Sequence, residues 1–147
     1  MSQEEQILQS FTYTIERGKI QEFAQAIGDD HRIYYDVEAA QREGYRDIPI
    51  PPTFPTAIEM WAGNDFDALT NALNLNPMHV LHGEQTYQYE KTLCAGDTVD
   101  GETTVADVTN KGGMTLYTLE TVLRHANDVA LRSKAVIIER KPKEEQT

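Results

Sequence analysis

The segment from Asp29 to Asp36, which reads DDHRIYYD, gathers residue types that could exchange protons. His31 lies two residues after Asp29, so a carboxylate and an imidazole on one loop could act as a couple. An imidazole, with an ordinary pKa of about 6.5, suits proton exchange at neutral pH. A phenol such as that of Tyr34, with an ordinary pKa of about 10, can hydrogen-bond and pack but is a poor general base.

Each of these residues also has a structural explanation. Asp29 and Asp30 follow a predicted helix end, where Asp commonly bonds nearby backbone amides and stabilises a turn. Asp36 is expected to cap the helix that follows it. Tyr34 and Tyr35 can cover the core, since tyrosines favour half-buried positions. The residues alone therefore leave open whether this loop is a site or a connection.

Two further segments could lie beside a bound carbonyl group. Residues 51–55, PPTFP, place the start of a helix there, and free amides at a helix start can polarise a carbonyl. His82 and Gly83 begin a strand, and a strand glycine permits either close approach of a helix or a lining for the carbonyl. Cys94 is expected to be a buried small hydrophobe rather than a nucleophile. The histidines lack the spacing of metal ligands, so no metal is expected.

The N-terminal half has the pattern of helices that would position these segments. A short strand is expected at 10–15, and apolar residues with helical spacing then lead to Gly28, an expected C-terminal cap. A short helix is expected after Asp36, ending at Gly44. A mostly buried helix is expected from Phe54 to about Ala62, with one apolar face and a capping box between Thr56 and Glu59. The apolar residues of the first and the third of these helices are Ile20, Phe23, Ala24 and Ile27, and Phe54, Ala57, Ile58 and Trp61.

The C-terminal half changes to the alternating pattern of strands, after a less periodic segment in which Phe66, Leu69 and Leu73 suggest a further helix. Four strands are expected at 82–93, 98–108, 114–125 and 129–140, with hairpin turns at 110–113 and 126–128. Helices followed by hairpin-linked strands predict an α+β fold, an antiparallel sheet with helices on one face. A long curved sheet wrapped around one buried helix accommodates every apolar stripe.

Size and charge narrow the classes of function. A chain of 147 residues predicts one domain, here over 7–140, with flexible tails at 1–6 and 141–147. A single cysteine and an acidic, polar start predict a cytoplasmic protein. A formal charge of -11 disfavours binding to nucleic acid or anionic lipid. No stretch approaches the roughly 20 apolar residues of a membrane span, so no membrane association is expected.

Three ordered motifs resemble one family: GDDHRIYYD from Gly28, then AAQREGYRDIPIPPTF, then HGEQTYQYEKTLCAGDTV from His82. They are similar to the MaoC-like dehydratases, over roughly residues 10–140, and most of all to the N-terminal-type half found in (3R)-hydroxyacyl-ACP dehydratase subunits. The resemblance implies a hot-dog fold, a long antiparallel sheet around a central helix, usually dimerised. Catalytic members carry an Asp and, five residues later, a His. At these two positions this sequence has Asp29 and Tyr34. Where the family pattern has an intervening Asn and Pro, this sequence has His31 and Arg32.

The implied reaction adds water to an enoyl thioester or removes it from a (3R)-hydroxyacyl thioester, with no cofactor. Because Tyr34 replaces the His, one interpretation is a non-catalytic, acyl-binding subunit whose hot-dog partner carries an intact pair. Another is an active homodimer in which Asp29 and His31, or His82, are catalytic. An interaction module that binds acyl-CoA, or a thioesterase using Glu59, is a third. In all of them the ligand is an acyl-CoA or acyl-ACP thioester, and the residues expected to contact it are Tyr34, Pro52, Thr53, Phe54, His82 and Gly83.

Overall fold

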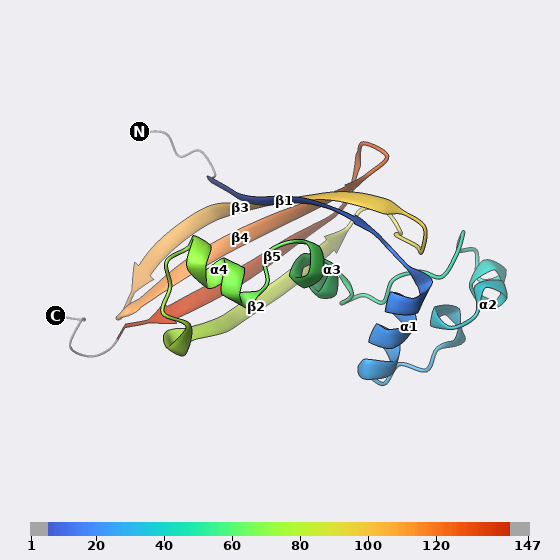
Figure 1. Cartoon of the computed structure of the whole chain (residues 1–147), viewed down its shortest axis with the longest axis horizontal. Helices are drawn as coiled ribbons and strands as arrows, with labels where there is room; N and C mark the ends of the chain where they lie inside the picture. Colours follow the sequence, from blue (N-terminus) through green and yellow to red (C-terminus); the bar gives the residue numbers. More distant parts are fainter. Residues whose placement is uncertain (1–5, 142–147) are drawn as a thin grey trace.

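The computed structural model describes residues 6–141, which form one antiparallel sheet of five strands with helices against it (Figure 1). The strands lie in the order β1-β3-β4-β5-β2, so β1 and β2 are the two edges. The α+β class is confirmed. The strands are β1 Gln6–Thr14, β2 Val80–Tyr89, β3 Thr98–Lys111, β4 Met114–His125 and β5 Asp128–Arg140.

Both predicted hairpins of the C-terminal half are present. Gly112 and Gly113 join β3 to β4, and Ala126 and Asn127 join β4 to β5. All four residues have positive φ angles, between 52° and 79°. Such two-residue turns match the right-handed twist of the strands that they connect. The turns therefore fix the register of three consecutive strands.

The strand predicted at 82–93 is wrong in its extent. It runs from Val80 and ends at Tyr89, because the next two amides, of Glu90 and Lys91, both donate to the single carbonyl of Ala130. The regular ladder with β5 cannot continue past that shared acceptor. Residues 90–93 leave the sheet there and become part of a pocket wall.

The helices follow the expected boundaries closely. Gly28, with a φ of 76°, and Gly44, with a φ of 96°, end the first two. Asp36 caps the second, since its Oδ1 accepts from the Glu38 amide at 3.0 Å. The helices are α1 Arg17–Ala26, α2 Val37–Arg42, α3 Pro55–Ala62 and α4 Phe66–Ala72, and short 3₁₀ turns occupy Arg32–Tyr34 and Pro77–His79.

Two details of α3 differ from the expectation. The capping box is wrong: Phe54, not Thr56, occupies the N-cap, and the Glu59 carboxylate accepts instead from hydroxyls of the sheet. Trp61 is 52% exposed, whereas Phe54 and Ile58 are fully buried. The buried face of α3 is therefore narrower than the apolar pattern suggests.

The apolar interior consists of two clusters beneath these helices. The larger is centred on Ile20 of α1, Phe54 and Ile58 of α3 and the inward side chains of β4 and β5. The smaller contains Leu75, Leu119 and Ile137. Figure 1 shows α3 and α4 against one face of the sheet, with α1 and α2 at one end of it. Within residues 6–141 no helix is long and apolar enough to cross a membrane.

Phe11 of β1 packs across the sheet onto Gly101 of β3, its cross-strand partner. A Cβ built on Gly101 lies 2.2 Å from the Phe11 ring, and the same ring lies about 3.0 Å from a Cβ built on Gly63, after α3. Gly101→Ala is therefore expected to displace the ring and lower the free energy of unfolding by about 2 kcal/mol in urea titrations. In a Phe11→Ala background the cost should vanish, whereas Gly18→Ala, with open space around it, should stabilise α1 slightly. An equal cost in both backgrounds would contradict this contact.

Candidate functional site

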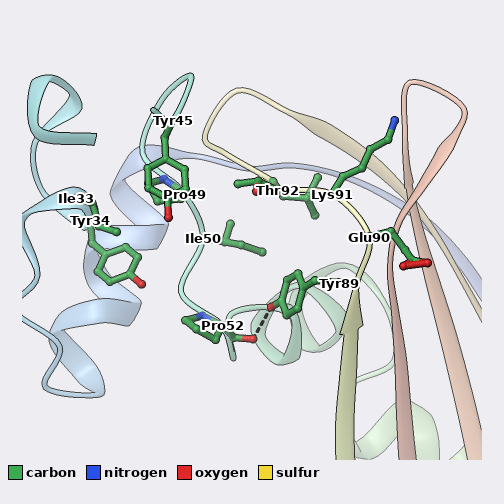
Figure 2. A pocket seen from close by; sticks show the side chains of 11 residues that line it. Ile33, Tyr34, Tyr45, Pro49, Ile50, Pro52, Tyr89, Glu90, Lys91 and Thr92 are labelled. Atoms are coloured by element: carbon green, nitrogen blue, oxygen red, sulfur yellow. Dashed lines mark hydrogen bonds between the residues drawn. The ribbon is translucent and has the colours of Figure 1, made fainter. Parts of the chain in front are cut away.

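A pocket of about 370 Å³ lies between the 3₁₀ turn at Arg32–Tyr34, the loop before α3 and the end of β2 (Figure 2). In Figure 2 the rings of Tyr34, Tyr45 and Tyr89 surround the space, while Lys91 points away from it. We call it the tyrosine pocket. Its lining residues are Ile33, Tyr34, Tyr45, Pro49, Ile50, Pro52, Tyr89, Glu90, Lys91, Thr92 and Leu93.

Tyr34 is buried, with 8% of its surface exposed, and its ring meets that of His31 edge-on, with centroids 6.1 Å apart. Burial raises the pKa of the Tyr34 phenol, and the nearby Asp29 carboxylate and Tyr45 raise it further. The phenol is therefore protonated at neutral pH and can donate a hydrogen bond. It cannot remove a proton from water, because a general base needs a pKa near the working pH.

Asp29 and His31 each bond the local backbone rather than each other. The Oδ1 of Asp29 accepts from the His31 amide at 3.0 Å, and the Nδ1 of His31 accepts from the Ile33 amide at 3.3 Å. The Tyr35 hydroxyl also fixes this turn by donating to the Asp29 carbonyl at 2.6 Å. His31 lines a separate surface depression beside α2. Asp29 lies close enough to Tyr34 for its charge to raise the Tyr34 pKa. A catalytic role for either Asp29 or His31 stays a prediction.

The start of α3 reaches the pocket only through Pro52. The Pro52 carbonyl accepts from the Tyr89 hydroxyl, which ties the loop before α3 to the end of β2. Thr53 is exposed, and Phe54 is fully buried in the core and packs edge-on against Phe23. Amides of the first turn of α3 already donate to the carbonyls of Thr53 and Phe54. The amides of Thr56, Ala57 and Ile58 are therefore not free to polarise a carbonyl.

A second cavity, of about 470 Å³, lies between α3, α4 and the covered face of the sheet, and we call it the helix cavity. His82 lines it from β2. Gly83 lies at a β-bulge, where a Cβ would come 2.7 Å from the Ile138 side chain, so the close neighbour is strand β5 and not a helix. The structure thus divides the predicted contact residues between two spaces: Tyr34 and Pro52 line one, and His82 lines the other.

A polar row that the sequence reasoning missed crosses the sheet beneath α3. It consists of Thr103, Thr121 and Ser133, which are cross-strand neighbours on β3, β4 and β5, together with Gln85 of β2. All three hydroxyl-bearing residues are buried. The Thr121 and Ser133 hydroxyls donate to the two oxygens of Glu59 at 2.8 and 3.2 Å. The sequence pattern that could have revealed this row is the presence of polar residues at strand positions whose side chains face the core.

Comparison with protein families identifies the chain. Residues 5–134 match the family described as FAS1-like, dehydratase domain region. The chain belongs to this family. A protein from Thermobifida fusca known as a UPF0336 protein is 39% identical over 108 residues, which are 74% of this chain and 70% of that protein. A UPF0336 protein of Clavibacter michiganensis is 32% identical over 76% of this chain and 74% of its own length.

Solved structures of dehydratases and hydratases share the fold. The truncated HadBC complex of Mycobacterium tuberculosis, a 3R-hydroxyacyl-ACP dehydratase, superposes with a TM-score of 0.79 at 18% identity over 94% of this chain and 98% of that one. The (R)-hydratase of A. caviae involved in PHA biosynthesis gives 0.68 at 15% identity over 90% and 92%. The hot-dog fold predicted from the motifs is confirmed, and the family match confirms the predicted relationship to dehydratases.

Tyr34 lines the tyrosine pocket. The correspondence of this position to the catalytic His of the MaoC-like pattern stays a prediction. Cys94, 1% exposed, lies in the core as expected, and burial raises the pKa of its thiol. Tyr45 and Tyr89, which complete the pocket wall, were not foreseen, because they lie in segments read as a connection and as a strand.

Proposed function

We propose that this chain is the acyl-binding member of a (3R)-hydroxyacyl-thioester dehydratase, which holds an acyl-CoA or acyl-ACP chain for a catalytic hot-dog subunit. The observation that supports this most strongly is the protonated phenol of Tyr34 in the tyrosine pocket. Activation of water needs a general base. The Tyr34 phenol is protonated, and the Asp29 carboxylate accepts from a backbone amide of its own turn and is not paired with an imidazole. The helix cavity, with a mostly apolar wall, offers the space for an acyl chain.

The sheet edges offer the means of pairing. The strand order leaves the outer backbone groups of β1 and β2 without a strand partner among residues 6–141. Such an edge can be covered by the strand of a second subunit. Among proteins of similar fold, HadBC and ChsH1-ChsH2 are complexes of two different subunits. A homodimer is the alternative for this chain, and it would contain two tyrosine pockets and no intact Asp and His pair.

The purified chain alone is expected to hydrate crotonyl-CoA at least about 10²-fold more slowly than a mixture with a paired, catalytic dehydratase subunit, since general acid–base catalysis contributes about 10²–10⁴-fold. The assay follows loss of the enoyl thioester absorbance for the chain, the partner and the mixture. The mixture should exceed the partner alone on long acyl chains, for which the helix cavity is needed.

Other outcomes identify the other functions. Hydration by the chain alone at the rate of the mixture, abolished by Asp29→Ala or His31→Ala, would contradict the proposal and support an active homodimer. Release of free thiol without hydration would instead indicate a thioesterase, with Glu59 as the carboxylate to replace first. The control is a Tyr117→Phe variant, which removes one hydroxyl outside the walls of both cavities and should leave the measured rates unchanged.

A further inference from the structure

The polar row forms a continuous set of hydrogen bonds with α3. Gln85 Nε2 donates to the Ser133 hydroxyl at 2.9 Å, and the Thr103 and Thr121 hydroxyls are 2.8 Å apart. Ser133 and Thr121 in turn donate to the Glu59 carboxylate. Side chains of four strands and one helix are therefore joined in one network, at the half-buried carboxylate of Glu59.

This row lies in the wall of the helix cavity, not inside solid packing. Glu59, Gln85, Thr103 and Thr121 all line that cavity. The rest of its wall is largely apolar, and the row lies between the larger and the smaller apolar cluster. An acyl chain in this cavity would meet apolar side chains over most of its length and hydrogen-bonding groups at the row. The apolar residues of the wall are Met60, Phe66, Leu69, Val80, Leu119, Ala135 and Ile137.

The Glu59 carboxylate is not fully used by the protein. Burial raises its pKa, and the bonds from Thr121 and Ser133 offset part of that rise. An ionised carboxylate has about four acceptor positions, and these two hydroxyls occupy two of them. Because hydroxyls and not a cation hold the carboxylate within residues 6–141, it keeps acceptor capacity toward the cavity.

We propose that the helix cavity takes an acyl chain that carries a hydroxyl group along its length, away from the thioester, and that Glu59 selects for this hydroxyl. This inference rests on the acyl-binding function proposed above and adds the substrate class. A hydroxyl can donate to an acceptor position of Glu59 that Thr121 and Ser133 do not occupy. A terminal carboxylate would be repelled by Glu59, and a plain alkyl chain would leave that position without a donor.

The test is calorimetric titration of the full chain with dodecanoyl-pantetheine and with its monohydroxylated positional isomers, because pantetheine is the part that CoA and ACP share. One isomer should bind about tenfold more tightly than the plain chain, as expected for a charge-assisted hydrogen bond. Glu59→Gln should reduce that preference to about twofold. Glu120→Gln, an equal change of charge at an exposed position next to Thr121 in the sequence, should keep the full preference.

The remaining outcomes separate this inference from the proposed function. Equal binding of all isomers, with Glu59→Gln lowering only the unfolding midpoint, would overturn the selection of a hydroxyl and leave Glu59 as an anchor between helix and sheet. Tighter binding of the plain chain would overturn it as well, while the acyl-binding function would stand. Failure of every thioester to bind would overturn both.

Discussion

Replacing Tyr34 with histidine is expected to raise the crotonyl-CoA hydration rate of the isolated chain by about 10²–10⁴-fold, the usual contribution of a positioned general acid–base group. The phenol that it replaces is protonated at neutral pH, because burial, Asp29 and Tyr45 all raise its pKa. An imidazole has an ordinary pKa of about 6.5 and exchanges protons in that range. The substitution therefore supplies the one chemical property that the pocket lacks.

The surroundings of Tyr34 favour this gain. The Asp29 carboxylate is close enough for its charge to act on the side chain at position 34, and a neighbouring carboxylate orients an imidazole and stabilises its charged form. The tyrosine pocket is already shaped around a planar ring, and histidine is smaller than tyrosine. The variant should therefore fold, with a modest loss of packing in the wall of the pocket.

The controls separate an imidazole beside Asp29 from an imidazole anywhere in the pocket. Tyr45→His places the same group at another position in the wall of the tyrosine pocket and should give no gain. Asp29→Ala in the Tyr34→His background should remove most of the gain. If Tyr34→His is as inactive as Tyr45→His, then Asp29 and position 34 do not form the pair that the family pattern implies.

Most element boundaries can be predicted from the sequence, because the residues that set them are close together in the chain. Glycines with positive φ end α1 and α2, and alternating strands meet at two-residue turns, so boundaries follow from backbone chemistry. The end of β2 depends instead on a tertiary contact, the sharing of the Ala130 carbonyl by two amides. Trp61 fits the apolar face of α3 by spacing, yet it is exposed, because the width of a buried face is set by what packs on it.

The site is harder to predict, because it is assembled from residues far apart in the chain. Tyr34, Tyr45 and Tyr89 reach one pocket from a 3₁₀ turn, a loop and a strand end, and spacing does not relate them. Glu59 looked like part of a capping box because Thr56 precedes it by three residues. Its actual partners, Thr121 and Ser133, are 62 and 74 residues away. The sequence indicates that network only through three polar residues at inward-facing strand positions, Thr103, Thr121 and Ser133.

Asp97 is expected to be the most important carboxylate for stability, and Asp97→Ala should lower the free energy of unfolding by about 3 kcal/mol. The side chain is 5% exposed and accepts from both terminal nitrogens of Arg46 at 2.8 Å. It also accepts from the buried Cys94 amide at 2.9 Å. Removing the carboxylate leaves that amide unpaired and frees the loop that carries Arg46.

Two further variants divide this effect between its causes. Asp97→Asn keeps an acceptor for the Cys94 amide but loses the charge, so about 1–2 kcal/mol should be lost. Asp128→Ala removes an exposed carboxylate paired with Lys91 and should have a much smaller effect, because water screens an exposed ion pair. Urea unfolding of the three variants gives the comparison. Equal losses for Asp97→Ala and Asp128→Ala would show that burial does not strengthen the Arg46 pair.

The stability contributed by the Asp97 charge should depend on pH in a defined direction. Burial alone would raise the pKa of Asp97, but the hydrogen bonds from Arg46 and Cys94 and the charges of Arg46 and His125 hold it below the ordinary value. The folded chain therefore binds this proton less readily than the unfolded chain. The stabilisation is complete above about pH 4, the ordinary range of an Asp, and is lost as the pH falls through the lower, folded pKa. The difference in unfolding free energy between the unmodified chain and Asp97→Asn should thus have its full value at about pH 5 and shrink in stronger acid. A difference that grew below about pH 5 would mean that the folded protein binds the Asp97 proton more tightly, against the geometry of the Arg46 pair.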